Sequence, residues 1–373
     1  MDISAFSAHH AAAYRILDPM PWDRLVGPMT AAEDALARLD ERLSKSAIRD
    51  GLASRMDFAD ACASQWLDGE LVHVEDLVLH DAMMDIRAPT AELVRAHETL
   101  RARRRIANAK PGWALTAGGL DALRGRATVA DDTPADQRIA IDHDWLDDDD
   151  EWEKTLAAVD AVVERSNRLL EGRPDARPDG QDRPSLVYDL DWDEDARLAE
   201  WRAVMASLSS APATLAAAVA LDAWNQIEPL QSQAWLGRLL AVDLLRSRLK
   251  TRAHLSCLSL GLKAVPQQMR WKKDPIVRLE VTLQGLAEAA TAGLKEHDRL
   301  VVASAMLQRR IEGRRSNSKL PLLRDLAVKS PIVTASLIAS RLGVSQRAAL
   351  MLAQDLGLRE TTGRKRYRAW TAA

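Results

Sequence analysis

The sequence has little cysteine and few aromatic residues, and it lacks a long apolar run. Its 373 residues include two cysteines, Cys62 and Cys257, which excludes a disulfide framework and a multi-cysteine zinc site. Aromatic residues make up 4% of the chain, and 11 of them are Trp. No apolar run approaches the about 20 residues that cross a bilayer, and the N-terminus lacks the pattern of a signal peptide. We expect a cytoplasmic bacterial protein without membrane contact, with both cysteines in the core.

The sequence also lacks the common signatures of cofactor and metal sites. It has no Walker loop and no dinucleotide-binding glycine fingerprint. His73 and His80 are seven residues apart, which predicts one helix face and favours packing over zinc binding. Residues 142–154 hold eight acids without the glycine and terminal glutamate of a calcium loop; Trp145 and Trp152 within them predict one docked helix face. We expect no cofactor, no metal and no catalytic residue.

Charge is distributed unevenly along the chain, although the net charge is only −3. Residues 301–373 contain 14 Lys and Arg against 4 Asp and Glu, a net charge of +10, and the other 300 residues contain 37 against 50, a net charge of −13. A basic end on an otherwise acidic protein indicates an anionic partner there, most often nucleic acid. The alternative is a basic tail that is solvated or binds a protein.

Helical periodicity dominates the rest of the sequence. Residues 31–48 and 91–107 predict amphipathic helices, the second with an Arg-rich outer face that we expect in water rather than on an anion. Residues 108–140 predict an irregular connection, and residues 172–186, rich in proline and charge, predict a linker or long loop. We therefore expect a mainly all-α protein with four regions: N-terminal helices (1–125), an acidic, Pro-rich connection (126–194), a helical core (195–312) and a C-terminal domain (313–373).

The C-terminal domain shows the spacing of a helix-turn-helix. A helix at 320–330 ends before Pro331, a second begins at a capping Thr334, and a third follows Ser345. Ala339 allows close helix approach and Gly343 accepts the left-handed conformation of the turn. On the third helix we expect a buried stripe and an outward face; the stripe is Ala349, Leu352, Ala353 and Leu356, and the outward residues are Gln346, Arg347, Leu350, Met351 and Gln354.

A basic hairpin follows the third helix. Residues 358–370 predict two short strands around Gly363, which resembles the β-wing of bacterial winged helix-turn-helix regulators. We predict double-stranded DNA as the partner, and the predicted contact residues are Ser345, Gln346, Arg347, Met351, Gln354, Arg359, Arg364, Lys365, Arg366 and Arg368. Arg347 suits guanine and Gln346 suits adenine, with phosphate contact the open alternative for each. Tyr367 and Trp370 favour wing packing over stacking on bases.

Residues 222–240 resemble the central motif of the Fic family of nucleotide transferases. Trp224, Ile227, Pro229, Leu230 and the run Gly237–Leu240 keep the frame of that motif, and residues 254–266 resemble the next Fic helix. The resemblance implies a helical scaffold that transfers nucleotides to hydroxyl side chains.

The residues of Fic chemistry are missing from this frame. Glu228 stands where the family has its catalytic His, and Gln-Ser-Gln-Ala-Trp at 231–235 replaces the glycine-rich phosphate nest. We therefore expect a catalytically inactive, Fic-like body. A diverged nucleotidyl transferase that uses Glu228 is the alternative.

Residues 64–69 resemble the inhibitory motif of Fic proteins, with Asp68 in place of its glutamate. In the family that glutamate pairs with an arginine of the central motif. We expect no such arginine here and assign Asp68 to the end of a helix before Gly69. The layout of the whole chain also resembles an uncharacterised bacterial family, often plasmid-borne, with this C-terminal domain.

These observations together predict a DNA-binding transcriptional regulator. A stripe of Leu300, Val301, Ala305 and Leu307 to Ile311 faces either a partner or the chain's own body. A single winged helix covers few base pairs, so we expect a homodimer on an inverted repeat. The body would support dimerisation or sense a small-molecule or protein effector. An antitoxin or adaptor protein that holds a partner protein is a further alternative.

Overall fold

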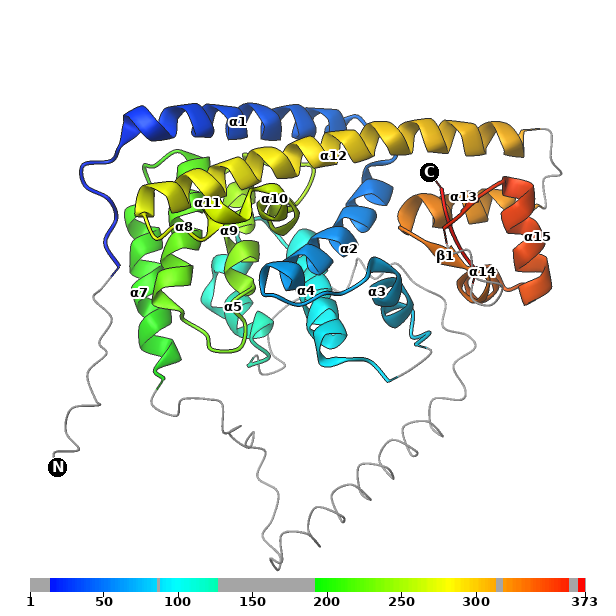
Figure 1. Cartoon of the computed structure of the whole chain (residues 1–373), viewed down its shortest axis with the longest axis horizontal. Helices are drawn as coiled ribbons and strands as arrows, with labels where there is room; N and C mark the ends of the chain where they lie inside the picture. The colour runs from blue at the N-terminus through cyan, green and yellow to red at the C-terminus, as the bar shows by residue number, and fades with distance from the viewer. Residues whose placement is uncertain (1–13, 86–87, 127–191, 313–317, 362–367, 373) are drawn as a thin grey trace, which may run out of the picture. The chain divides into compact units, whose positions relative to one another are not determined.

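Two long helices, α1 (Trp22–Ser44) and α12 (Pro275–Ile311), run side by side along the helical body (Figure 1). The computed structural model describes residues 14–85, 88–126, 192–312, 318–361 and 368–372, and all of these except Trp192 belong to one compact unit. Asp274 caps α12 by accepting a hydrogen bond from the Ile276 N–H, and Pro275 occupies the first turn. The acidic segment 142–154, with Trp145 and Trp152, and the linker 172–186 lie outside the described residues.

The helix predicted over 31–48 has different ends in the structure. It is part of α1, which begins at Trp22 and stops at Ser44, because the chain turns before α2 (Arg49–Leu67). In that turn the Ser46 hydroxyl accepts a hydrogen bond from the Ile48 N–H (3.3 Å) and contacts the His297 Nε2 atom (2.9 Å). Such a local side-chain bond competes with helix propagation.

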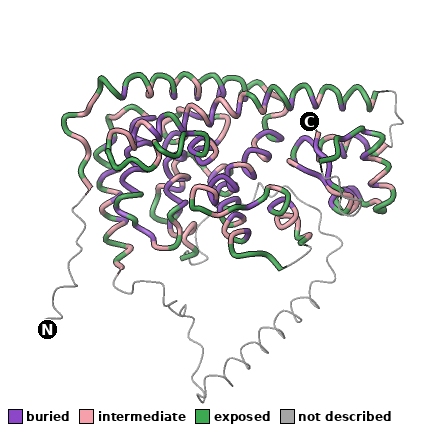
Figure 2. The backbone as a smooth tube through the Cα atoms, viewed as in Figure 1, coloured by how far each residue is buried: buried purple, intermediate pink, exposed green. Residues whose placement is uncertain are grey.

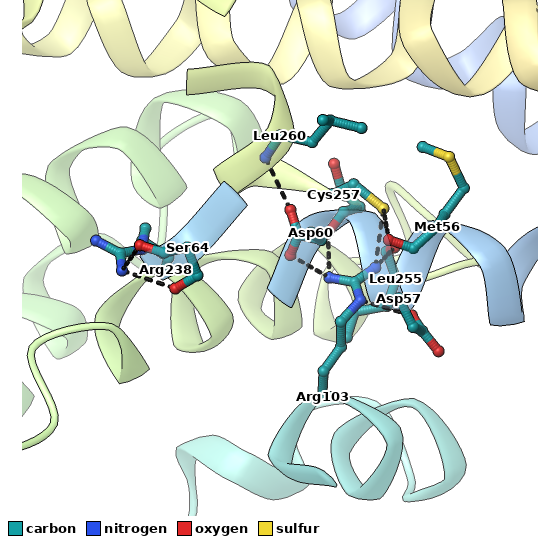
Figure 3. A network of polar contacts seen from close by, with 10 residues as sticks. Met56, Asp57, Asp60, Ser64, Arg103, Arg238, Leu255, Cys257 and Leu260 are labelled. Carbon is teal, nitrogen blue, oxygen red and sulfur yellow. Dashed lines mark hydrogen bonds and ion pairs between the residues drawn. The ribbon is translucent and has the colours of Figure 1, made fainter. Parts of the chain in front are cut away.

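Helices α3 (Val74–Asp81) and α4 (Ala91–Asn108) pack against α2. The Arg-rich outer face predicted for α4 does not include Arg103, whose side chain is 1% exposed. Its guanidinium donates to Asp57 (2.6 Å) and Asp60 (2.9 Å) on α2 and to the carbonyls of Leu255 and Ser256 (Figure 3). A buried charge requires such partners, so this cluster fixes α4, α2 and the 255–257 segment together.

The region predicted as an irregular connection at 108–140 contains a 3-10 turn (Trp113–Leu115) and the short helix α5 (Ala117–Leu123). Thr116 caps α5 by accepting from the Gly119 N–H. The fully buried carboxylate of Asp243 accepts from the backbone N–H groups of Gly112 (3.2 Å) and Ala114 (3.1 Å). The prediction failed here because a distant carboxylate, and not a local apolar period, holds the segment.

The centre of the body is built from α7 (Glu194–Ser207), α8 (Ala213–Ile227), α9 (Leu236–Ser247), α10 (Leu258–Ala264) and α11 (Gln267–Arg270). Trp201 and Trp224 meet edge to face in this core, with ring centroids 5.3 Å apart. At Gly261 an added Cβ would lie 1.9 Å from the Gly285 carbonyl oxygen, so glycine lets α10 approach α12. Buried residues gather in the middle of the body, and the outer edges of α1 and α12 are exposed (Figure 2).

The expected mainly α-helical class is confirmed, because within the described ranges the strands are confined to one small C-terminal sheet. In the same ranges, no helix is long and apolar enough to cross a membrane.

We predict that Arg103→Ala lowers the free energy of unfolding by about 3–5 kcal/mol, because it leaves buried carboxylates without their cation. Burial raises the pKa of Asp60, and the guanidinium opposes that rise. A carboxyl whose pKa is raised by folding destabilises the folded state as the pH increases, so the loss in the variant should shrink as the pH falls toward about 4. Urea unfolding measures both effects.

The exposed Arg101 on the same helix provides the matched control. Arg101→Ala should change the free energy of unfolding by less than about 0.5 kcal/mol. Equal urea midpoints for the two variants would contradict a structural role for the Arg103 cluster.

Candidate nucleic-acid interface

Three helices form the C-terminal domain: α13 (Leu320–Lys329), α14 (Ala335–Leu342) and α15 (Gln346–Leu356). The predicted caps are present, since the Thr334 hydroxyl accepts from the Leu337 N–H and the Ser345 hydroxyl accepts from the Ala348 N–H. Gly343 has φ +61° between α14 and α15, a left-handed conformation that glycine adopts without steric cost. The structure therefore confirms the helix-turn-helix that this spacing predicts.

A three-stranded antiparallel sheet closes the domain, with strand order β1-β3-β2. β3 (Ala369–Thr371) pairs on one side with β1 (Val333–Thr334) and on the other with β2 (Arg359–Glu360). The strand β1 was missed, because a two-residue strand before a cap gives no alternating pattern. Trp370 is 4% exposed in the domain core, which agrees with wing packing; Tyr367 lies outside the described residues.

One face of α15 is buried and the other faces solvent. Ala349, Ala353 and Leu356 are fully buried, as predicted. Leu352, predicted in the buried stripe, and Leu350, predicted to face outward, are both half-buried at the border between the two faces. The exposed face carries the following predicted contact residues: Gln346, Arg347, Met351 and Gln354, with Ser345 exposed at the cap.

Two of the predicted wing contacts lie in the described residues. Arg359 is exposed at the start of β2, and Arg368 is exposed but has its Nε atom 3.4 Å from the Glu360 carboxylate. That exposed ion pair is weak and breaks at little cost. Arg364, Lys365 and Arg366, together with the predicted hairpin tip, lie outside the described residues.

The C-terminal end of α15 is held by α12. The Arg310 guanidinium donates to the carbonyls of Leu356 (2.8 Å) and Gly357 (2.7 Å). Gly357 has φ +64°, and an added Cβ there would lie 1.5 Å from the Arg310 Nη1 atom. A cation at the carbonyl end of a helix complements the negative pole of its dipole. This contact leaves the N-terminal turn of α15, with Gln346 and Arg347, facing solvent.

A second arginine joins α13 to the body. Arg55 on α2 is 5% exposed, and it donates to the carbonyls of Ala327 (3.1 Å) and Ser330 (2.5 Å) and to the Glu296 carboxylate on α12 (3.1 Å). At Gly51 an added Cβ would lie 2.7 Å from the Val328 side chain, so α2 and α13 are in close contact. The C-terminal domain is therefore docked on the body and not merely tethered to it.

The apolar stripe predicted near the end of α12 is partly buried and partly exposed. Leu300 and Leu307 are buried in the chain's own cores, whereas Val301 and Ala305 of the stripe are exposed. Val302 and Met306, which the prediction did not include, are exposed beside them. Val301, Val302 and Met306 lie within six consecutive residues of α12.

The segment that resembles the Fic motif has no open phosphate site. Glu228 ends α8 in a left-handed conformation with φ +49° and is exposed. The Trp224 indole donates to the Ala234 carbonyl (3.1 Å), and Trp235 is buried. At Gly237 an added Cβ would lie 2.2 Å from the Trp224 ring. Indole rings thus fill the space around the 231–235 segment.

The expectation that Asp68 has no arginine partner is wrong. Arg238 on α9 donates to both carboxylate oxygens of Asp68 (3.1 and 2.8 Å) and to the Ser64 hydroxyl (2.8 Å; Figure 3 shows Ser64 and Arg238). Asp68 does end helix α2, as predicted. The pair was missed because its two residues lie 170 positions apart in the sequence.

The histidines and cysteines make no metal site in the part of the chain that the structure describes. His73 precedes α3 as its cap, so His73 and His80 do not share a helix face as predicted. His80 contacts Asp85 (2.7 Å), and His97 contacts Asp81 (3.3 Å). Cys62 and Cys257 are buried as expected, and burial raises the pKa of Cys62 to about 12.

Comparisons with known proteins identify the relatives of both parts of the chain. Residues 320–372 match a family described as an HTH DNA binding domain, and residues 186–312 match a family described as a protein of unknown function, DUF1612. The chain is 46% identical over 365 residues to the uncharacterized protein y4cF of Sinorhizobium fredii, covering 93% of this chain and 96% of that protein.

We predict that Arg310→Met loosens the last turn of α15, because two carbonyls lose a cationic donor. Hydrogen bonds to a charged group contribute about 1.5–3 kcal/mol, and partial exposure puts this site at the low end. Hydrogen exchange of the amides at 353–358 should become faster than in the parent protein. The adjacent Arg309→Met, at an exposed position, should leave it unchanged; equal exchange in both variants would rule out the proposed cap.

Proposed function

Because the chain belongs to the family of y4cF and carries a helix-turn-helix DNA-binding domain, we propose that it is a sequence-specific transcriptional regulator that binds double-stranded DNA. The observation that carries this proposal is how α15 is held in the domain. Its C-terminal carbonyls are capped by Arg310, and its N-terminal turn presents Gln346 and Arg347 to solvent. Recognition helices contact base edges with residues of this turn. Such a role would place the protein with the DNA in the cytoplasm.

The proposed contacts divide into two groups. On α15, Arg347 binds guanine and Gln346 binds adenine in the major groove, with Ser345, Met351 and Gln354 beside them. In the wing, Arg359 and Arg368 contact phosphates, as do the predicted tip residues Arg364, Lys365 and Arg366. The net charge of +10 on residues 301–373 supports this division, because phosphate contacts supply most non-specific affinity.

We further propose that the protein is a homodimer on an inverted repeat. The exposed side chains of Val301, Val302 and Met306 on α12, directly before the DNA-binding domain, support a self-association surface. Two copies would double the bases read, as two-fold symmetric regulators do. We also propose that the body senses a small-molecule or protein effector, to which no site is assigned.

The body is proposed to be non-catalytic. The Asp68–Arg238 pair supports the resemblance to Fic proteins, because it joins the two motifs that pair in that family. The alternative of a diverged transferase has less support: Glu228 is an exposed helix-ending residue, and the 231–235 segment is packed against indole rings. An antitoxin or adaptor role has no specific observation in its favour.

The decisive experiment selects duplexes from a random library with the full-length protein and then measures affinity. Arg347→Ala should weaken the selected duplex by about 1–3 kcal/mol and relax its sequence preference at one position. Arg359→Ala should instead weaken selected and random duplexes alike, with a shallower dependence of log affinity on log salt. Failure to enrich any sequence, or equal effects of Arg347→Ala on both duplexes, would contradict base reading by α15.

A further inference from the structure

A basic, aromatic segment lies in the body, far in sequence from the DNA-binding domain. Residues 263–273 contain Lys263, Arg270, Lys272 and Lys273 and no acid. This excess of +4 lies within the first 300 residues, whose net charge is −13. The proposed function uses none of these residues.

The structure places two of these cations, Lys263 and Arg270, over an indole ring of α2. The Lys263 Nζ atom lies 5.1 Å from the centroid of Trp66, and the Arg270 guanidinium lies 4.8 Å from it. Both distances are those of cation–π contacts. Arg270 also donates to the Val265 carbonyl (3.1 Å), so the surface is held by its own contacts.

The C-terminal end of the segment faces solvent. Trp271 is 73% exposed, and Lys272 and Lys273 are exposed beside it. The four cations form no ion pair with a carboxylate in the described ranges. The next acid, Asp274, caps α12 and lies 3.8 Å from Arg24. We call Trp66, Lys263, Arg270, Trp271, Lys272 and Lys273 the basic–aromatic surface.

Helix α12 connects this surface to the DNA-binding domain. It begins directly after Lys273 and Asp274, and its last turn carries Arg310, which caps α15 (Figure 1). Its 37 residues correspond to a length of about 55 Å at 1.5 Å per residue. That length equals about 16 base pairs of duplex at 3.4 Å per pair.

We propose that the basic–aromatic surface binds the phosphate backbone of the same DNA duplex, outside the sequence that α15 reads. The proposal rests on the proposed function, because the duplex is brought to the protein by α15. Unpaired exposed cations on an acidic body fit a polyanion, and the exposed indole offers an apolar face to the sugar edge. Once α15 is bound, the second contact is intramolecular and gains from the high effective concentration of flanking DNA.

The test compares two double variants of the full-length protein. Lys272→Gln with Lys273→Gln removes two charges from the surface at exposed positions, so the fold is not disturbed. Arg38→Gln with Lys45→Gln removes two charges from exposed positions, one on α1 and one at its C-terminal cap, and serves as the control. Fluorescence anisotropy measures the affinity of each protein for random-sequence duplexes of about 14 and about 40 base pairs. One half-site spans about one helical turn, so the shorter duplex has room for α15 but does not extend to the basic–aromatic surface.

On the longer duplex, the surface variant should reduce the slope of log affinity against log salt by about 1.8, which corresponds to two phosphates at about 0.9 each. On the shorter duplex it should match the parent protein, and the control should match the parent on both. Arg359→Ala should weaken binding to both lengths.

The outcomes separate the two proposals. If the parent protein binds duplexes and the surface variant matches it on both lengths, only this inference is overturned. Weakening on single-stranded DNA of about 40 nucleotides but not on duplex would also overturn it. If the parent protein binds no duplex at either length, the proposed function fails and this inference fails with it.

Discussion

The contact between Arg310 and the carbonyl end of α15 holds the C-terminal end of the helix that we propose reads DNA. The last carbonyls of any helix lack internal partners and carry partial negative charge. Here Leu356 and Gly357 receive donors from a guanidinium on α12. The opposite end of α15 lies at the surface, where its dipole favours phosphate. This contact thus leaves the N-terminal turn of α15 available for the DNA reading that we propose.

Buried arginines extend the same logic into the body. Arg55 joins α2, α12 and α13, and Arg103 joins α4, α2 and the 255–257 segment. A guanidinium has five donors in a fixed plane, so it satisfies several carbonyls and carboxylates from different elements at once. Removing one partner of such a buried guanidinium lowers the free energy of unfolding. These contacts therefore make the docking of the C-terminal domain specific. The body therefore serves as a platform on which the C-terminal domain is held.

The sequence was most informative where local rules decide the structure. Thr334, Gly343 and Ser345 identified the helix-turn-helix, because caps and a left-handed turn depend on single residues and their neighbours. The sequence was misleading where contacts between polar residues far apart in the chain decide the structure. Arg103 looked like a surface residue of a polar helix, although Asp57 and Asp60, three residues apart on α2, offered a matching acidic pair. The Asp68–Arg238 pair joins residues 170 positions apart, beyond any local pattern.

The central claim is that α15 reads the major groove with its N-terminal turn. Methylation interference with the full-length protein on its selected duplex tests this most directly, because methylation of guanine N7 blocks the major-groove acceptor that arginine uses. The account predicts interference at guanine N7 in two symmetric clusters, with centres about 10 base pairs or a multiple apart. Interference confined to adenine N3 in the minor groove, or none at any base, would contradict it.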